Sequence, residues 1–168
     1  MRNLFLLTIS LIGSFSFSQC DKITNVFDDM KNIRTISSPH KNNFSAFTGT
    51  IKKIYQIEAS KVIRDDVSTM FIIFTGYGST SLIGSKGLYV KLSNGEIIRL
   101  EDNKIESSYL SKGIYYYTSI LQIDESNIDL FSNNDIIQFD MSIYKFSPKD
   151  KDDKLLKEYI KCIYSIKD

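Results

Sequence analysis

The feature that most constrains the fold of this chain is an alternation of apolar and polar side chains that begins near residue 47. Side chains on a strand point to opposite faces in turn, so this period is typical of strands with one wet face. The alternating set is Phe47, Gly49, Ile51, Tyr55 and Ile57. The segment 69–75 (TMFIIFT) is apolar on both faces of a strand, which predicts a central strand covered on both sides.

Asn94-Gly95 lies between two further alternating runs, 88–92 and 98–100. A type I′ turn places both central residues at positive φ, which Asn and Gly tolerate. We therefore expect a β-hairpin with this turn over about 87–101.

Three more strands are predicted over 32–37, 114–123 and 136–146. In the second of these, one face carries Tyr115, Tyr117, Leu121 and Ile123. A short helical turn capped by Asp124 is expected over 124–131.

The C-terminus changes to a helical period. Ser147, Pro148 and Asp150 suit an N-cap, a first-turn proline and an N3 acid. The apolar stripe that follows contains Leu155, Leu156, Tyr159, Ile160, Cys162, Ile163 and Ile166. We expect a helix over about 149–166, in a mainly β fold with a C-terminal helix, arranged as an antiparallel β-sandwich or an open barrel.

Residues 1–18 have the composition of a signal peptide, with one basic residue, an apolar run over 4–13, and Ser16 and Ser18 spaced like the −3 and −1 positions of a cleavage site. The run is shorter than the about 20 apolar residues that span a bilayer. We expect a single exported domain over 19–168, in the periplasm, at the cell surface or secreted, with no transmembrane span in the mature chain.

The charge of the mature domain is balanced. The chain has 21 Lys and Arg and 20 Asp and Glu, and Arg2 is the only charge in the leader, so cleavage leaves equal numbers of each sign. A neutral chain with mixed signs gives no electrostatic reason to bind nucleic acid. About 150 residues bury roughly two-thirds of their unfolded surface, so the domain needs no metal or dense set of disulfides to fold. No cofactor-binding pattern is present in the sequence, and we expect no cofactor.

Cys20 and Cys162 are the only cysteines. In an exported chain an even count suggests a disulfide, which here would hold both ends of the domain. A lipid anchor at Cys20 is the alternative, although Phe17 and Gln19 depart from the aliphatic and small residues that lipoprotein processing prefers. The two exclude each other, and two free thiols are a third possibility.

Three segments together carry a resemblance, namely KGLYVKLSNGEIIRL, IYKFS and LLKEYIKCI. With the leader and the early cysteine, they make residues 45–164 similar to small exported β-rich proteins of Gram-negative bacteria that have no assigned activity. The resemblance implies a structural role for Cys162 and transfers no site residues.

Candidate chemical groups are sparse. His40 is the only histidine and lies in a polar loop, so a histidine-rich zinc site is excluded. The glycine- and serine-rich segments 76–81 and 84–87 lead into a strand, whereas phosphate-binding loops lead into a helix. We interpret them as a flexible loop between strands.

The acidic groups and tyrosines have ordinary structural interpretations. Asp150, Asp152 and Asp153 lack the glycine and the distal glutamate of a calcium loop. A helix N-terminus explains the acidic group Asp124, Glu125 and Asp129. A turn explains Asp65 and Asp66. An aromatic platform for sugar is the alternative to sheet packing for Tyr77, Tyr89, Tyr115, Tyr116 and Tyr117. No catalytic, cofactor or metal residue is assigned.

Two functions remain open from the sequence. We favour a non-catalytic binding or scaffolding domain at the cell envelope, with an envelope protein or a glycan as partner. The alternative is a hydrolase of cell-wall or extracellular polymer, which requires two carboxyl groups about 5–10 Å apart across a groove.

Overall fold

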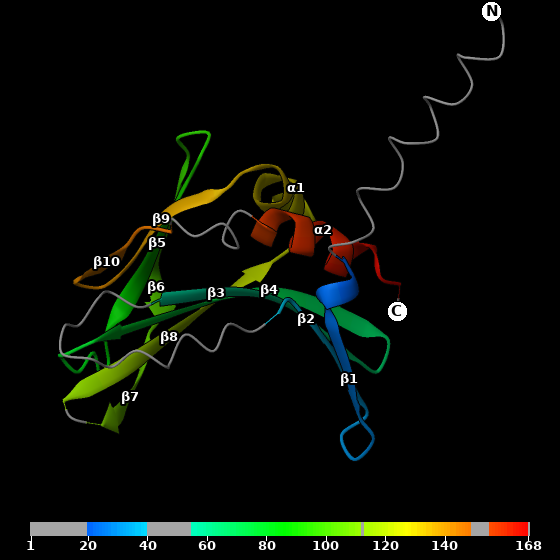
Figure 1. The fold of residues 1–168 in the computed structure, drawn as a ribbon, viewed down its shortest axis with the longest axis horizontal. Helices are drawn as coiled ribbons and strands as arrows, with labels where there is room; N and C mark the ends of the chain where they lie inside the picture. Colours follow the sequence, from blue (N-terminus) through cyan, green and yellow to red (C-terminus); the bar gives the residue numbers. More distant parts are fainter. Residues whose placement is uncertain (1–19, 40–54, 112, 149–154, 168) are drawn as a thin grey trace, which may run out of the picture.

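The computed structural model describes residues 20–39, 55–111, 113–148 and 155–167. They form two antiparallel sheets, two α-helices and a short 3-10 helix (Figure 1). In chain order the elements are η1 (Cys20–Lys22), β1 (Thr24–Asp28), β2 (Ile33–Ser37), β3 (Tyr55–Arg64), β4 (Val67–Gly78), β5 (Lys86–Leu92), β6 (Ile97–Lys104), β7 (Glu106–Ser111), β8 (Ile114–Ile123), α1 (Glu125–Asn133), β9 (Ile136–Met141), β10 (Tyr144–Phe146) and α2 (Leu156–Ser165).

The larger sheet has the order β1-β2-β3-β4-β8-β7, and the smaller sheet has the order β10-β9-β5-β6. Figure 1 shows the smaller sheet over one end of the larger sheet, and α1 and α2 over another part of the same face. This confirms a mainly β, antiparallel, sandwich-like fold with a C-terminal helix. In the part of the chain that the structure describes, no helix is long and apolar enough to cross a bilayer.

The core lies between the sheets and under the helices. Along β4 the inward side chains Met70, Ile72 and Phe74 are buried, whereas the intervening ones are half-buried. The smaller sheet contributes Phe139, whose ring centroid lies 5.1 Å from that of Phe74. Burial of each such side chain stabilises the fold by about 1.5–3 kcal/mol.

The C-terminal helix packs its apolar stripe on the larger sheet but begins later than expected. Its buried residues are Leu156, Tyr159, Ile160 and Ile163, as the stripe predicts. Leu155 holds the N-cap position without a side-chain hydrogen bond. The predicted cap Ser147 and first-turn Pro148 are not helical, and Asp150 lies outside the described residues. The prediction relied on local capping preferences, which do not set where packing begins.

The hairpin over 87–101 is confirmed as β5 and β6, but its turn is not type I′. Of the turn residues 93–95, only Gly95 has a positive φ, at 90°. The Gly95 amide donates to the Leu92 carbonyl over 3.0 Å, which makes a three-residue loop with glycine at the left-handed position. Instead, Asp65 (φ 49°) and Asp66 (φ 64°) form a two-residue turn with positive φ at both positions.

The prediction of a single strand over 136–146 is wrong. A turn at Ser142 (φ 53°) divides it into β9 and β10, which pair with each other. The sequence does not predict the strands β1 and β7. Around β1 the apolar residues Ile23, Val26, Phe27 and Met30 recur at helical spacing, and β7 is largely polar.

The other predicted strands are present. β2 and β8 confirm the strands over 32–37 and 114–123. β4 is interior in its sheet, as predicted, but one of its faces is buried and the other only half-buried, so full cover on both sides is not observed. α1 begins after its Asp124 cap, as expected. The alternating residues before Tyr55 lie outside the described residues.

Candidate functional site

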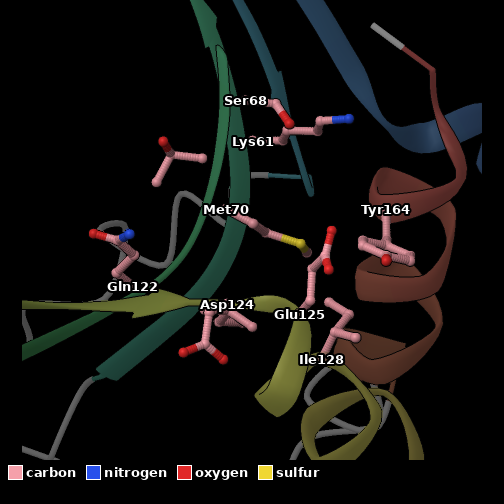
Figure 2. A pocket seen from close by; sticks show the side chains of 10 residues that line it. Lys61, Ser68, Met70, Gln122, Asp124, Glu125, Ile128 and Tyr164 are labelled. Atoms are coloured by element: carbon pink, nitrogen blue, oxygen red, sulfur yellow. The ribbon is translucent and has the colours of Figure 1, made fainter.

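A hollow of about 270 Å³ lies at one end of the larger sheet (Figure 2). It is lined by the ends of β3, β4 and β8 and by residues of both helices. The pairing of β4 with β8 ends at Met70 and Ile123, and the chain then turns through Asp124 into α1. The hollow therefore forms where the sheet ends and the two helices converge on it.

Lys61 on β3 is the charged residue at the inner wall. It faces inward beside Ile36 and Met70 in the sheet register, and only 8% of its surface is exposed. Its Nζ donates to the Ile166 carbonyl over 2.8 Å, at the end of α2 where the helix dipole is negative. Lys61 therefore holds the end of α2 against the sheet.

Asp124 and Glu125 begin α1 and have different roles. The Asp124 carboxylate accepts bonds from the Ser126 hydroxyl (2.6 Å) and the Asn127 amide (3.0 Å). The Ser126 bond, helped by Asn127, lowers the pKa of the Asp124 carboxyl. Figure 2 shows Asp124 turned away from the hollow and Glu125 pointing toward Tyr164. Of the two carboxylates in the described lining, Glu125 is thus the one that faces the hollow.

The chemistry of this hollow favours binding. Met70 and Ile128 give it an apolar floor, while Lys61, Glu125 and Tyr164 give it polar groups. Its volume is near the lower end of small-molecule sites, about 300–1,000 Å³. Asp124 and Glu125, the carboxylates of its described lining, are consecutive residues rather than a pair across a groove, so the hollow lends no support to a two-carboxylate hydrolase.

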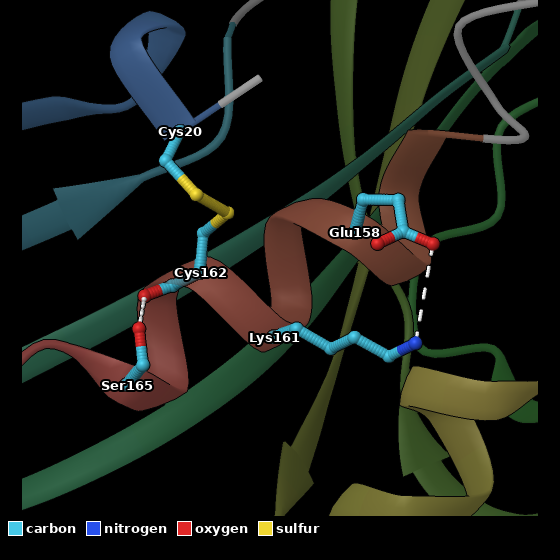
Figure 3. Close-up of a disulfide and its surroundings, with 5 residues drawn as sticks. All are labelled: Cys20, Glu158, Lys161, Cys162 and Ser165. Carbon is cyan, nitrogen blue, oxygen red and sulfur yellow. Dashed lines mark hydrogen bonds and ion pairs between the residues drawn. A yellow bond between two sulfur atoms is a disulfide. The ribbon is translucent and has the colours of Figure 1, made fainter. Parts of the chain in front are cut away.

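The two cysteines form a disulfide between η1 and α2 (Figure 3). Their Cα atoms lie 5.7 Å apart although 142 positions separate them in the sequence. The carbonyl of Cys162 also accepts a bond from the Ser165 hydroxyl over 2.8 Å. Because the Cys20 sulfur is part of this disulfide, it cannot also carry a lipid thioether. The disulfide itself suggests an oxidising environment.

The structure disperses the other candidates from the sequence. His40, Asp150, Asp152 and Asp153 lie outside the described residues. Gly76 and Gly78 belong to β4 rather than to a loop, and Gly87 belongs to β5. The intervening segment connects two strands, as predicted, and Gly84 within it has φ 74°.

The tyrosines do not form one platform. Tyr115 and Tyr117 face inward, while Tyr116 pairs with Tyr77 on the opposite face of the larger sheet. Burial, with nearby Tyr116 and Glu58, raises the pKa of Tyr77.

Tyr117 is buried and belongs to the core. It stacks on Tyr144 with the ring centroids 5.0 Å apart. Burial also raises the pKa of Tyr117, whose hydroxyl donates to the Thr80 carbonyl over 2.6 Å. This pair is sheet packing that fixes the loop after β4.

Sequence reasoning missed Lys61, Met70, Gln122 and Tyr164, which line the hollow. A signal existed for Lys61, since it continues the inward series Tyr55, Ile57 and Ala59 as a charged residue at an apolar phase.

The described residues offer no metal site, and the chain matches no known protein. Within the described ranges, no three His, Cys, Asp or Glu side chains gather as a metal site would require. Comparison of the chain with models of known families, with curated proteins and with solved structures finds no match.

Proposed function

We propose that the protein is exported, is cleaved after Ser18, and acts as a non-catalytic binding or scaffolding domain at the cell envelope. The observation that carries this proposal is the Cys20–Cys162 disulfide, which begins two residues after the expected cleavage site. A covalent bond between the mature start and the last helix suits a domain that works in an oxidising compartment.

The hollow supports binding as the activity. Glu125 and the half-exposed Tyr164 present a carboxylate and an aromatic ring beside an apolar floor. A basic or hydroxyl-bearing group of an envelope protein or glycan would match these groups. The Asp124 carboxylate caps α1 and is turned away from the hollow, so Glu125 is the one carboxylate of the described lining that faces a ligand there.

The experiment begins with the full chain expressed in a Gram-negative host and recovered from its envelope fractions. We expect the intact mass of a chain that begins at Gln19, lower than the mass of the reduced form of that chain by two hydrogen atoms. The mature protein is then tested for binding to purified cell-wall sacculi and for crosslinking to envelope proteins. Glu125→Lys and Tyr164→Ala should each weaken capture at least fivefold, an effect of about 1 kcal/mol.

Glu106→Lys and Tyr109→Ala are the matched controls, because both residues are exposed on β7 and do not line the hollow. Equal losses in the controls would contradict a site at the hollow. A diacylglycerol adduct would contradict the disulfide, and release of soluble fragments from the sacculi would contradict a non-catalytic role.

A further inference from the structure

Within the described ranges, strand β1 pairs with another strand on one side only and so forms an open edge of the larger sheet. It is the terminal strand in the order β1-β2-β3-β4-β8-β7, and Figure 1 shows it at the margin of the molecule, beyond β2. Every second residue of an edge strand directs its N–H and C=O groups outward, where they can pair with another extended backbone. The four residues Thr24, Asn25, Val26 and Phe27 are all exposed.

The other sheet edges carry features that discourage pairing, which β1 lacks. β7 has a register shift near its end, and β10 has only three residues. β6 also has a register shift and carries several charges, at Arg99, Glu101, Asp102 and Lys104. By contrast, β1 pairs with β2 without a break in register and has no charge from Thr24 to Phe27.

Apolar side chains flank this open edge on both faces. Val26 is 62% exposed and Phe27 is 56% exposed, and as neighbours on a strand they point to opposite faces. Met30, just beyond the strand, is 97% exposed. An added strand would cover apolar surface on both sides of the sheet as well as satisfy the backbone.

We infer that β1 pairs with β1 of a second copy of this chain, antiparallel and about a twofold axis. The charges at the two ends of the strand favour this occupant. Asp28 already pairs with Lys31 over 3.6 Å, so Asp29 is the acid left at the far end, while Lys22 follows Asp21 at the near end. In an antiparallel pair Lys22 of each copy lies beside Asp29 of the other, whereas a parallel pair would bring like charges together.

The edge is held in place before the second copy arrives, which lowers the entropy cost of pairing. Cys20 ties the residues before β1 to α2 through the disulfide. The Asn25 side chain accepts a bond from Arg34 Nε over 3.0 Å. The Asp28 carboxylate accepts the Met30 and Lys31 amides at 3.1 and 3.2 Å, closing the turn to β2.

Sedimentation equilibrium of the oxidised mature chain tests this inference. The paired strands are short and the interface is therefore small, so we expect a reversible dimer with Kd in the range of about 1–100 μM. Val26→Lys should raise this Kd at least tenfold. Val67→Lys is the matched control, because Val67 is 66% exposed but lies on an interior strand of the same sheet.

Charge exchange tests the antiparallel direction and does not depend on how Val26→Lys folds. Lys22→Glu and Asp29→Lys should each weaken the homodimer at least threefold, and a mixture of the two variants should regain dimer. The inference is overturned if the wild-type chain stays monomeric, if it grows into open-ended oligomers, if Val67→Lys weakens the dimer equally, or if the mixture does not recover. It does not rest on the proposed function.

Discussion

At the scale of single residues, two glycines of β4 let the sheets approach each other. A Cβ at Gly76 would lie 2.8 Å from Met141 Cε and closer still to the Phe146 ring. A Cβ at Gly78 would lie 2.7 Å from the hydroxyl of Tyr144 on β10 of the smaller sheet. These contacts come from a packed core, which resists added volume, so glycine is required here for space rather than for turn geometry.

Gly76→Ala should therefore lower the free energy of unfolding by about 1–3 kcal/mol, measured by urea denaturation. Thr75→Ala is the control, since it is the adjacent residue on the same strand and faces the opposite side. A loss no larger for Gly76→Ala than for Thr75→Ala would mean that the rings above β4 move aside freely.

At the scale of elements, α1 depends on its Asp124 cap. The carboxylate satisfies the Asn127 amide at the exposed start of the helix, and its pKa is lowered in the folded state by the bond from Ser126 and by Asn127. A lowered folded pKa means that the ionised cap stabilises the fold above the ordinary pKa and loses this effect as the pH falls through the lowered value.

Asp124→Ala should lower the melting temperature at neutral pH, because the helix loses its cap. The difference from the wild-type protein should shrink as the pH falls below the ordinary value of 3.8. Asp124→Asn should keep most of the cap, since asparagine is also a good N-cap residue. Because asparagine does not titrate, the contribution of the cap to stability should no longer depend on pH in this variant. Thermal unfolding followed by circular dichroism from pH 7 downward checks both, and a difference for Asp124→Ala that persists unchanged in acid would contradict the role of the charge.

At the scale of the whole molecule, the disulfide closes nearly the entire domain into one loop. It joins η1 to α2 across 142 positions, and α2 itself lies on β3 and beside α1. The half-buried ion pair of Lys157 with Asp135, at 3.1 Å, also ties α2 to the segment after α1. Unfolding one end of the chain therefore disturbs the other.

Cys20→Ser combined with Cys162→Ser should lower the free energy of unfolding by about 3–5 kcal/mol, because the open chain gains entropy when it unfolds. Denaturation of the wild-type protein with and without reductant provides the control, and the reduced wild type should behave like the double variant. A difference below about 1 kcal/mol would show that the remaining contacts of α2 are sufficient to hold the chain ends.

Local patterns predicted most of the strands and the cap of α1, because alternation and capping depend on neighbouring residues. The presence of only two cysteines favoured a disulfide but could not show which elements it joins. The same local patterns failed for the polar strand β7 and for β1, whose stability comes from pairing with other strands. They also missed the turn at Ser142, where a non-glycine residue adopts a positive φ.

The sequence by itself therefore determined that this chain is an antiparallel β domain with a terminal helix and two cysteines available to pair. Only the tertiary structure decided that Lys61 meets the end of α2, that Glu125 faces Tyr164, and that β1 has a single neighbouring strand among the residues that the structure describes. The physical reason is that periodicity records which face of an element is apolar, whereas the order of the strands and the contacts between distant side chains arise only when those faces pack together.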